Sequence, residues 1–330
     1  MSGYTPPYEI TDKILSLVAS ISEKIGRVTE RSNLDSKPHL RKNNKIKSIH
    51  SSLAIEANSL SLGEVKDVLN GKIVLGAEKE IQEVKNAYIA YDEISTVDVY
   101  SLNELKRLHG IMTKYLVDIS GEFRLGEEGV FDGDKCIFMA PPARLVPEQM
   151  ENLFTWMKKS KDIVHPLILA AVFHYEFVFI HPFTDGNGRM ARLWHSAILT
   201  RWQPIFEFIP IESQIEKFQS GYYVAISKCH IDGTSTAFIE FILEQINAIL
   251  DEIGSSLTSP ASSISEYVSK LLNVMEFDTP YTANDILTLL GLKSKETLRK
   301  NYLTPAINDG FVVMELPDKP NSKNQRYIKK

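Results

Sequence analysis

One twelve-residue segment, from His181 to Arg192, carries the residue types that chemistry on phosphates needs. Gly186 and Gly188 free the backbone to bring successive N–H groups toward an anion, and a helix after them would add its positive end. Arg189 and Arg192 lie three residues apart, so they would share a face near the start of that helix. Guanidinium groups bind phosphate oxygens in pairs. The segment therefore predicts an anion-binding site.

Two further side chains of this segment could supply a metal ligand and a base. Asp185 is a carboxylate, the ligand that Mg²⁺ takes together with phosphate oxygens. His181 is the side chain here that can accept a proton near neutral pH. Transfer of a phosphoryl or nucleotidyl group to a hydroxyl needs such a base, and otherwise depends on positioning and charge neutralisation. The segment thus indicates transfer of a phosphate-containing group.

The same glycines also fit a dinucleotide-binding pattern, which the surrounding sequence rejects. Gly186-x-Gly188-x-x-Ala191 follows the apolar run 177–180, and Glu207 lies downstream where a ribose-binding acid would be expected. However, the five residues 181–185 separate the run from the first glycine, where the pattern needs the turn at once. No alternation of strands and helices surrounds the segment either.

Helical periodicity dominates the chain on both sides of this segment. Helices are predicted at 10–29, 48–55, 64–69, 78–96, 102–116, 150–158, 165–180, 189–202, 213–227 and 236–253. The basic stretch 41–47 is interpreted as a solvated helix face or a loop. Between 121 and 147 turn residues cluster, and 130–139 predicts a β-hairpin around an Asp132-Gly133-Asp134 turn.

The C-terminal part is set apart by a stretch rich in Ser, Thr and Pro at 254–265, which predicts a linker. Beyond it, helices are predicted at 264–275, 282–290 and 294–309, followed by strands at 311–316 and 325–328. Two helices joined by a turn and then a two-stranded wing follow the winged-helix order. The sequence therefore predicts a mainly α body followed by a small α+β domain.

The string HPFTDGNGRMAR, from His181 to Arg192, resembles the motif HPF-x-[D/E]-GNGR-x-x-R of the Fic (filamentation-induced by cAMP) family at every fixed position. The resemblance covers about residues 1–250, and the tail is similar to the winged helix that often follows the Fic domain. It implies a Fic-type helical bundle with a small β-hairpin flap. Fic enzymes mostly transfer AMP from ATP to a Ser, Thr or Tyr hydroxyl of a protein, releasing pyrophosphate with Mg²⁺.

The resemblance implies a role for each residue of the motif. His181 would deprotonate the target hydroxyl, Asp185 would hold Mg²⁺, and Arg189 and Arg192 would bind the outer phosphates of ATP. The anion cradle would be formed by Gly186, Asn187 and Gly188. Phe183 would anchor the segment in the core.

Two supporting segments also resemble parts of Fic proteins. The predicted hairpin resembles the flap that aligns the backbone of the target protein. Ile137, Phe138 and Met139 would there contact the nucleotide, although a surface hairpin with one apolar face fits the same pattern. Tyr222 and Tyr223 resemble the helix beside the nucleotide, where a tyrosine can stack on adenine. Adjacent residues cannot share one helix face, so one of the two tyrosines can belong to the core.

The stretch 51–58 resembles the inhibitory helix of Fic proteins, with the pattern [S/T]-x-x-x-E-[G/N]. Ser52 and Glu56 fit, whereas Ala57 stands at the Gly/Asn position and Asn58 follows. In the family the glutamate pairs with the second arginine of the motif, here Arg192, and keeps the ATP γ-phosphate from binding productively. The resemblance therefore implies autoinhibition by a helix that precedes the catalytic core.

The tail differs in charge from the rest of the chain. Residues 281–330 hold nine Lys and Arg against five Asp and Glu, whereas the whole chain carries a net charge of −5. Lys293, Lys295, Arg299 and Lys300 open the second helix, where winged helices contact DNA. Small winged helices also dock proteins, and docking or oligomerisation is the interpretation that we favour over DNA binding.

Composition sets the remaining limits. The 330 residues, with 43% hydrophobic and 24% charged, predict a folded protein of about two domains, and no apolar run is long enough to span a membrane. Two cysteines outside any CxxC pattern, and no signal peptide, predict a cytoplasmic protein without a structural zinc site. His174 and His195 have no neighbouring metal ligands and are assigned to the core.

The sequence thus predicts four regions and leaves two alternative functions. The regions are an N-terminal helical region (1–100), a Fic catalytic core (101–253), a linker (254–265) and a winged-helix-like domain (266–330). The expected partner is a protein with a target hydroxyl, including the chain itself, and a homo-oligomer stays open. The alternatives are a Fic enzyme that transfers another nucleotide, a phosphate or phosphocholine, and a DNA-binding regulator gated by a nucleotide.

Overall fold

The structure, a computed structural model, describes residues 4–31, 38–132, 135–258, 265–277, 279–320 and 322–329. The chain divides into two compact units, one of residues 1–32 with 44–254 and one of residues 33–43 with 255–330. Helices make up most of the regular structure, and the strands form two small sheets. The predicted mainly α fold is confirmed, and the finer boundaries between the four predicted regions stay predictions.

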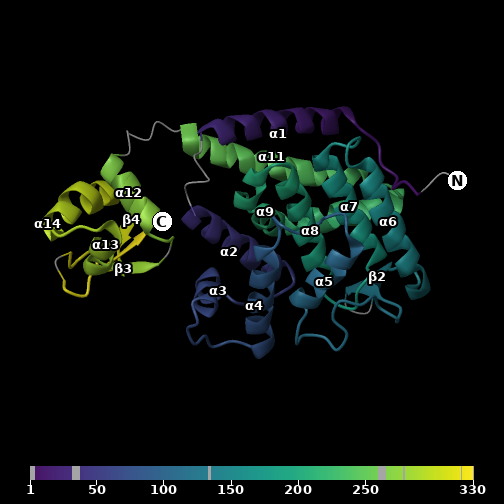
Figure 1. Cartoon of the computed structure of the whole chain (residues 1–330), viewed down its shortest axis with the longest axis horizontal. Helices are drawn as coiled ribbons and strands as arrows, with labels where there is room; N and C mark the ends of the chain where they lie inside the picture. The colour runs from purple at the N-terminus through teal and green to yellow at the C-terminus, as the bar shows by residue number, and fades with distance from the viewer. Residues whose placement is uncertain are drawn as a thin grey trace. The chain divides into compact units, whose positions relative to one another are not determined.

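The helices up to residue 258 surround a central pair (Figure 1). Their bounds are α1 Asp12–Arg31, α2 Pro38–Ile55, α3 Leu62–Leu69, α4 Glu78–Asp92, α5 Leu102–Met112, α6 Val146–Ser160, α7 Pro166–Ile180, α8 Asn187–Trp202, α9 Ile211–Lys217, α10 Gln219–Asp232 and α11 Thr236–Thr258, with short 3₁₀ turns η2 Ala143–Leu145 and η3 Pro204–Phe208. The central α7 and α8 are buried along nearly their whole length. The long α1 lies along α11, where Lys24 pairs with Asp251 at 2.6 Å. The segment between α7 and α8 is therefore held by the best-packed part of the unit.

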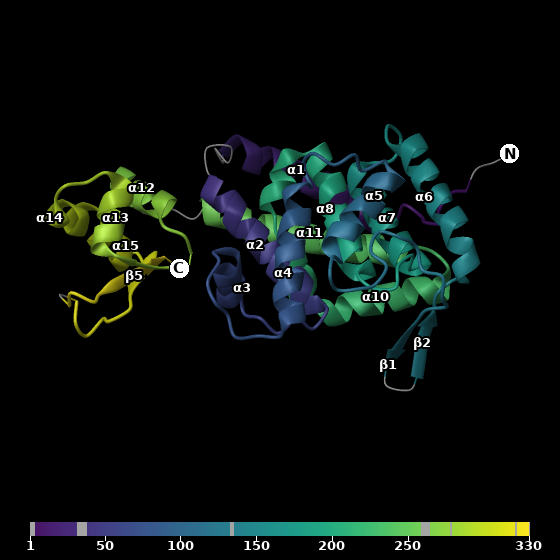
Figure 2. The ribbon, with the colours of Figure 1, turned by 60° about the horizontal axis from the view of Figure 1, so that its bottom comes forward.

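A β-hairpin projects from the helical body (Figure 2). Strand β1 (Gly129–Asp132) pairs antiparallel with β2 (Lys135–Met139), and Gly129 lies opposite Met139. The two strands confirm the predicted hairpin. Its turn at Gly133 and Asp134, and the side chains of residues 130–137, lie outside the described parts of the chain.

The C-terminal unit combines short helices with a three-stranded sheet. Its elements are α12 Glu266–Val274, β3 Pro280–Thr282, α13 Ala283–Leu290, α14 Lys295–Thr297, the π-helical stretch η4 Leu298–Leu303, α15 Thr304–Asn308, β4 Val312–Met314 and β5 Arg326–Lys329. The sheet order is β3-β5-β4, all antiparallel. Gly291, in the left-handed conformation with φ of 65°, ends α13 as a C-cap. The predicted order of helices and strands is confirmed, and β3 is an addition that three residues are too few to signal.

Several predicted element boundaries are wrong. The helix predicted at 213–227 is two helices, α9 and α10, because Phe218 breaks the ladder with φ of −113° and ψ of 34°. The helix predicted at 236–253 ends too early, since α11 runs to Thr258; residues 259–264 lie outside the described parts. The helix predicted at 294–309 is divided by η4. Neither glycine nor proline marks the break at Phe218, so periodicity alone could not place it.

The basic stretch 41–47 is helical, because α2 begins at Pro38, earlier than the predicted start at residue 48. Lys45 lies over the ring of Tyr88, 4.1 Å from its centre, and pairs with Asp92. Proline is favoured at the first position of a helix, where its missing N–H costs no hydrogen bond.

No helix among the described residues is long and apolar enough to cross a membrane.

Candidate active site

The segment predicted to bind phosphate, 181–192, comprises the loop after α7 and the first turns of α8. His181 caps α7 in the left-handed conformation, with φ of 50° and ψ of 59°, and its N–H donates to the carbonyl of Phe177. Gly186, with φ of 82°, precedes the first residue of α8. The loop between the two helices is thus six residues long, 181–186, and the first N–H groups of α8 have no acceptor within the helix.

Asn187 and Phe183 fix the shape of this loop from within. Oδ1 of Asn187 accepts the N–H of Phe183 at 2.9 Å, and Nδ2 donates to the carbonyl of Phe183 at 2.6 Å. Phe183 is fully buried and stacks on the ring of His109, with 3.6 Å between centroids. The expected anchoring role of Phe183 agrees with this burial, and the side chain of Asn187 holds the loop, so only its backbone N–H is left for an anion.

His109, on α5, supports the loop from below, and the sequence analysis did not identify it. Its Nδ1 accepts the N–H of Gly121 at 2.9 Å, so its Nε2 carries the proton and donates to the carbonyl of Asp185 at 2.9 Å. A Cβ on Gly186 would lie 2.9 Å from Thr113 and 3.6 Å from His109, so only glycine fits there. Burial lowers the pKa of His109 to about 4.

This low pKa predicts acid sensitivity of the fold. Between pH 6.5 and about 4 the unfolded chain binds a proton at His109 and the folded chain does not, so acidification removes up to about 3 kcal/mol of unfolding free energy. Urea unfolding of the wild type and of His109→Gln across this pH range measures the contribution. The variant should lose less stability on acidification; an equal loss would contradict the prediction.

Arg124 ties the loop to the base of the hairpin, and it too was missed as a functional residue. Its guanidinium donates to the carbonyls of His181 at 2.7 Å and Gly126 at 2.8 Å, and also to that of Pro141. Its backbone N–H donates to Pro182 at 2.9 Å. The side chain is 3% exposed, so a buried cation with carbonyl partners fixes the backbone of His181 relative to the strand β2.

The ring of His181 lies at the edge of the pocket described below. Burial and, next, the charge of Arg124 lower its pKa, whereas a hydrogen bond to the carbonyl of Val178 opposes the shift. The neutral ring therefore donates one N–H to Val178 and keeps the other nitrogen as a proton acceptor. This is the state that a general base needs.

Asp185 and Arg189 form an ion pair that extends to α4. Oδ1 of Asp185 accepts from Arg189 at 2.8 Å, and Glu83 lies 3.5 Å from the other side of the guanidinium. Asn58 donates to Glu83 at 2.8 Å. Burial raises the pKa of Asp185, but Arg189 and the N–H of Gly186 together lower it, and the net shift is downward. The carboxylate is therefore ionised.

This ionised, partly exposed carboxylate fits the chemistry of Mg²⁺. Mg²⁺ is commonly held by one or two carboxylates and the phosphates of a nucleotide, with water completing the shell. Within the described residues no group of three or more His, Cys, Asp or Glu could hold a metal alone. The residues therefore suit a metal that arrives with a nucleotide, and Asp185 is the protein ligand they offer.

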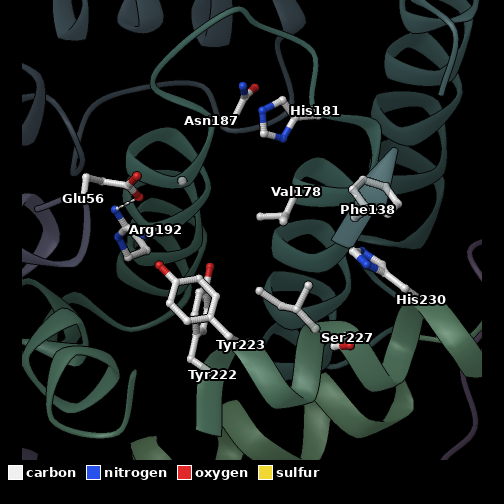
Figure 3. A pocket seen from close by; sticks show the side chains of 12 residues that line it. Glu56, Phe138, Val178, His181, Asn187, Arg192, Tyr222, Tyr223, Ser227 and His230 are labelled. Atoms are coloured by element: carbon white, nitrogen blue, oxygen red, sulfur yellow. Dashed lines mark hydrogen bonds and ion pairs between the residues drawn. The ribbon is translucent and has the colours of Figure 1, made fainter. Parts of the chain in front are cut away.

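Arg192 points at the end of α2 (Figure 3). Its Nη2 donates to Oε1 of Glu56 at 2.8 Å and to the carbonyl of Ser52 at 2.9 Å, and its Nε donates to the Ser52 hydroxyl at 3.0 Å. The Arg192 side chain is 1% exposed and that of Glu56 is 40% exposed. Burial, the largest cause, lowers the pKa of Arg192, but Glu56 together with Tyr222 and Tyr91 raises it, and the net shift is upward. A Cβ on Gly188 would collide with the Glu56 carboxylate, which thus lies over the first turn of α8.

Ala57 stands where the inhibitory-helix pattern has glycine or asparagine, and its backbone conformation is one that those residues adopt readily. It has φ of 65°, and its N–H donates to Ala54 while the N–H of Asn58 donates to Leu53, the pattern of a Schellman C-cap. Left-handed conformation costs an L-residue about 1 kcal/mol or more. The alanine keeps the geometry that presents Glu56, at a cost in stability.

Replacing Ala57 with glycine should therefore stabilise the fold. The gain from relieving the left-handed strain exceeds the entropy gained by the unfolded chain, and the expected net change is about 0.5 kcal/mol. Ala54→Gly, three residues earlier in the same helix, should instead destabilise by about 1 kcal/mol. Chemical denaturation of both variants tests the pair; a loss of stability in Ala57→Gly would contradict the prediction.

A cavity of about 290 Å³ brings many of the predicted residues together (Figure 3). Its lining contains the predicted residues Glu56, Phe138, His181, Asn187, Gly188, Arg192, Tyr222 and Tyr223, with Val178, Ile226, Ser227 and His230 in addition. The volume is near the lower end for ligand pockets. Asp185, Gly186 and Arg189 belong to the adjoining loop and helix start rather than to this lining. The cavity joins the anion-binding turn to an apolar end.

The two tyrosines of α10 differ in environment. Tyr222 is 2% exposed, and its hydroxyl lies 3.0 Å from Nε2 of His174 in the core, whereas Tyr223 is 49% exposed. Tyr222 is thus the tyrosine that belongs to the core, but it also lines the cavity, as Tyr223 does. His174 and His195 are buried and their rings contact each other, which agrees with their assignment to the core.

The hairpin contributes one predicted residue to the cavity. Phe138 stacks on His230, with 4.0 Å between centroids, at the apolar end. Met139 is 57% exposed and does not belong to the lining, and the side chain of Ile137 lies outside the described residues. His230, Ser227 and Val178 were missed, because single residues on a helix give no signal of the pocket they face.

Comparison with known proteins gives two family matches. Residues 99–199 match the Fic/DOC family, and residues 266–328 match the C-terminal domain of "filamentation induced by cAMP protein Fic-like". A crystal structure of a Fic family protein from Desulfovibrio desulfuricans is 39% identical, with a TM-score of 0.74, and the match covers 99% of this chain and 98% of that one.

Curated relatives are similar over the body of the chain. A protein adenylyltransferase Fic from Nematostella vectensis is 30% identical over 227 residues, which cover 64% of this chain and 49% of that protein. Protein adenylyltransferase fic-1 from Caenorhabditis elegans is 27% identical over 241 residues, 68% of this chain and 44% of that protein. The chain spans about half the length of these curated relatives.

Proposed function

This chain belongs to the Fic family, and on that premise we propose that it is a protein adenylyltransferase. It transfers AMP from ATP to a Ser, Thr or Tyr hydroxyl of a protein and releases pyrophosphate. The observation that carries the proposal is the cavity that joins a proton acceptor, His181, to the helix start at Gly188 and to Arg192. The names of the curated relatives support the choice of AMP.

The chemical step follows from this arrangement. His181 takes the proton of the target hydroxyl, whose oxygen bonds to the α-phosphorus while the bond from that phosphorus to the α–β bridging oxygen breaks. Pyrophosphate leaves with the electrons of that bond. The N–H groups at the start of α8 and the cationic Arg189 and Arg192 neutralise the charge that gathers on the phosphates. When bound, Mg²⁺ held by Asp185 would supply further charge neutralisation.

The apolar end of the cavity suits the base of the nucleotide. Phe138 and His230 present aromatic surfaces there, and a purine ring can stack on an aromatic face. The hairpin that carries Phe138 is a two-stranded sheet, so β2 pairs with β1 on one side only, and its other edge can pair with the backbone of a target protein. The target is therefore a polypeptide that presents its hydroxyl next to β2.

Glu56 makes the described state an inhibited one. Its carboxylate pairs with Arg192 and lies over Gly188, where an outer phosphate of ATP would need to bind. Two anions cannot occupy this place together, since like charges at contact repel strongly in a buried site. We therefore assign Ser52 and Glu56 a regulatory role, with Ser52 holding Arg192 in place for either partner.

The experiment that tests the activity follows labelled ATP in the Glu56→Gly variant, with Mg²⁺ and a mixture of candidate acceptor proteins. Label on the α-phosphorus should become protein-bound, including on the chain itself, and label on the γ-phosphorus should not. Intact-mass analysis should find a gain of one AMP with ATP and none with the other nucleoside triphosphates. Protein-bound γ-label, or an adduct from another nucleotide, would contradict AMP transfer and show that the enzyme transfers a different group.

A further inference from the structure

The inhibitory helix α2 meets α8 through a polar stripe. Ser48, Ser52 and Glu56 recur every four residues, so they form one stripe along α2. Ser52 and Glu56 bind Arg192 on α8, and the stripe continues away from the cavity to Ser48. The contact that places Glu56 thus adds hydrogen bonds one helical turn apart to the apolar packing of Ile49 and Leu53, which are buried on the same helix.

A buried carboxylate, Glu212 on α9, joins the two helices at the next turn. It accepts the hydroxyl of Ser48 at 2.7 Å from α2 and that of Ser196 at 2.8 Å from α8. Tyr91, on α4, donates to it at 3.1 Å. Ser196 lies four residues after Arg192 on α8, and Ser48 lies four residues before Ser52 on α2. The bridge through Glu212 is therefore one helical turn from the contact between Ser52 and Arg192. Glu212 is 1% exposed, and three hydroxyls donate hydrogen bonds to its two oxygens.

Three more hydrogen bonds attach α2 to the segment around α9. Nδ2 of Asn44 donates to the carbonyl of Phe208 at 2.6 Å, and the hydroxyls of Ser51 and Ser213 lie 3.0 Å apart. Nε2 of Gln219 donates to the carbonyl of Ile55 at 3.1 Å, next to Glu56. The hydrogen bonds of α2 with the segment around α9 thus extend from Asn44 to Ile55.

We propose that Glu212 is a positioning residue that docks α2 and thereby sets how strongly Glu56 blocks the site. The proposal rests on the proposed function, in which Glu56 inhibits by pairing with Arg192. Glu212 acts through Ser48, since this hydroxyl fixes the axial position of α2 from which Glu56 reaches Arg192. Because water can satisfy each of these groups when the helices separate, the docking is reversible and each hydrogen bond contributes to it modestly.

A matched pair of variants separates docking from general support of the core. Ser48→Ala and Ser196→Ala each remove one hydroxyl from the same carboxylate, but only the first removes a contact of α2. Glu212→Gln weakens the whole bridge with little change in shape. Glu252→Gln is the control for the substitution itself, because Glu252 also contacts α9, through Gln214 and Lys217.

Hydrogen–deuterium exchange of the full chain reads the docking without any assumption about activity. Amides of residues 44–58 should exchange about threefold to tenfold faster in Ser48→Ala and Glu212→Gln, with α6 unchanged. Ser196→Ala and Glu252→Gln should keep the wild-type rate in 44–58. Unchanged exchange of 44–58 in both Ser48→Ala and Glu212→Gln, or equal acceleration in Ser196→Ala, would overturn the proposal.

AMP transfer then tests the link to the active site. Ser48→Ala and Glu212→Gln should raise transfer about threefold to tenfold in the wild-type background and should not raise it further in Glu56→Gly. An equal rise in both backgrounds, or a loss in both, would mean that Glu212 acts on catalysis by another route and would overturn the proposal. Absence of transfer from Glu56→Gly alone would instead contradict the proposed function, and the exchange result would still decide the docking.

Discussion

Replacing Glu56 with glycine is expected to raise AMP transfer by about tenfold or more. The variant removes the carboxylate that pairs with Arg192 at 2.8 Å and that lies over Gly188. Arg192 then becomes available to the outer phosphates of ATP. A charge-assisted hydrogen bond to a buried group contributes about 1.5–3 kcal/mol, which corresponds to the expected change in rate when ATP must displace it.

The variant should act without disturbing the site it opens. Ser52 still accepts two hydrogen bonds from Arg192, so the guanidinium keeps its place when Glu56 is absent. Glu56→Gln is the informative control, because it keeps the size of the side chain and removes its charge. We expect it to raise transfer less than glycine does, since the amide still fills the space above Gly188.

Transfer of α-labelled phosphate from ATP to protein measures both variants against the wild type. Binding of ATP, measured separately by titration calorimetry, should tighten or change its mode in Glu56→Gly. Equal transfer by the wild type and Glu56→Gly, in a preparation where ATP binds to both, would contradict inhibition by this residue.

The parts of this site that the sequence predicts are those contained in one short stretch. From His181 to Arg192 the residue types and spacing indicate a base, a metal ligand, a turn and two cations, and the structure places them on the loop after α7 and on the first turns of α8. The body of the fold follows equally from periodicity, because most helices keep one apolar face. Phe218 shows the limit of this reasoning, since a break without glycine or proline leaves the periodic pattern intact.

The residues that hold the site in position escaped prediction because they act across long stretches of chain. His109 meets Asp185 from 76 residues away, and Ser48 meets Glu212 from 164 residues away. Each is a single polar side chain in an otherwise ordinary helix, and its role exists only once the helices pack. Ala57 is similar, because its left-handed conformation is imposed by the capping of α2 and its residue type argues against it.

Replacing His181 with alanine is expected to reduce AMP transfer by about 10²–10⁴-fold, measured in the Glu56→Gly background where transfer is high. A target hydroxyl is a weak nucleophile until a base takes its proton, and His181, beside the helix start at Gly188, has one ring nitrogen that is not committed to the carbonyl of Val178. ATP binding should survive, because the helix start at Gly188 and Arg192 are unchanged. Loss of ATP binding with loss of transfer would indicate a positioning role instead.

The pH dependence of the Glu56→Gly variant should carry the signature of this base. Burial and the charge of Arg124 lower the pKa of His181 below the ordinary 6.5, so the neutral form that accepts a proton persists to more acidic pH than a free histidine allows. Below that lowered pKa the ring is protonated, and kcat/KM should fall tenfold per pH unit. Between there and neutral pH it should stay flat. A fall in kcat/KM that begins above pH 6.5 would mean that the titrating group is not His181, because the two largest influences on this ring, burial and the charge of Arg124, both disfavour its protonated form.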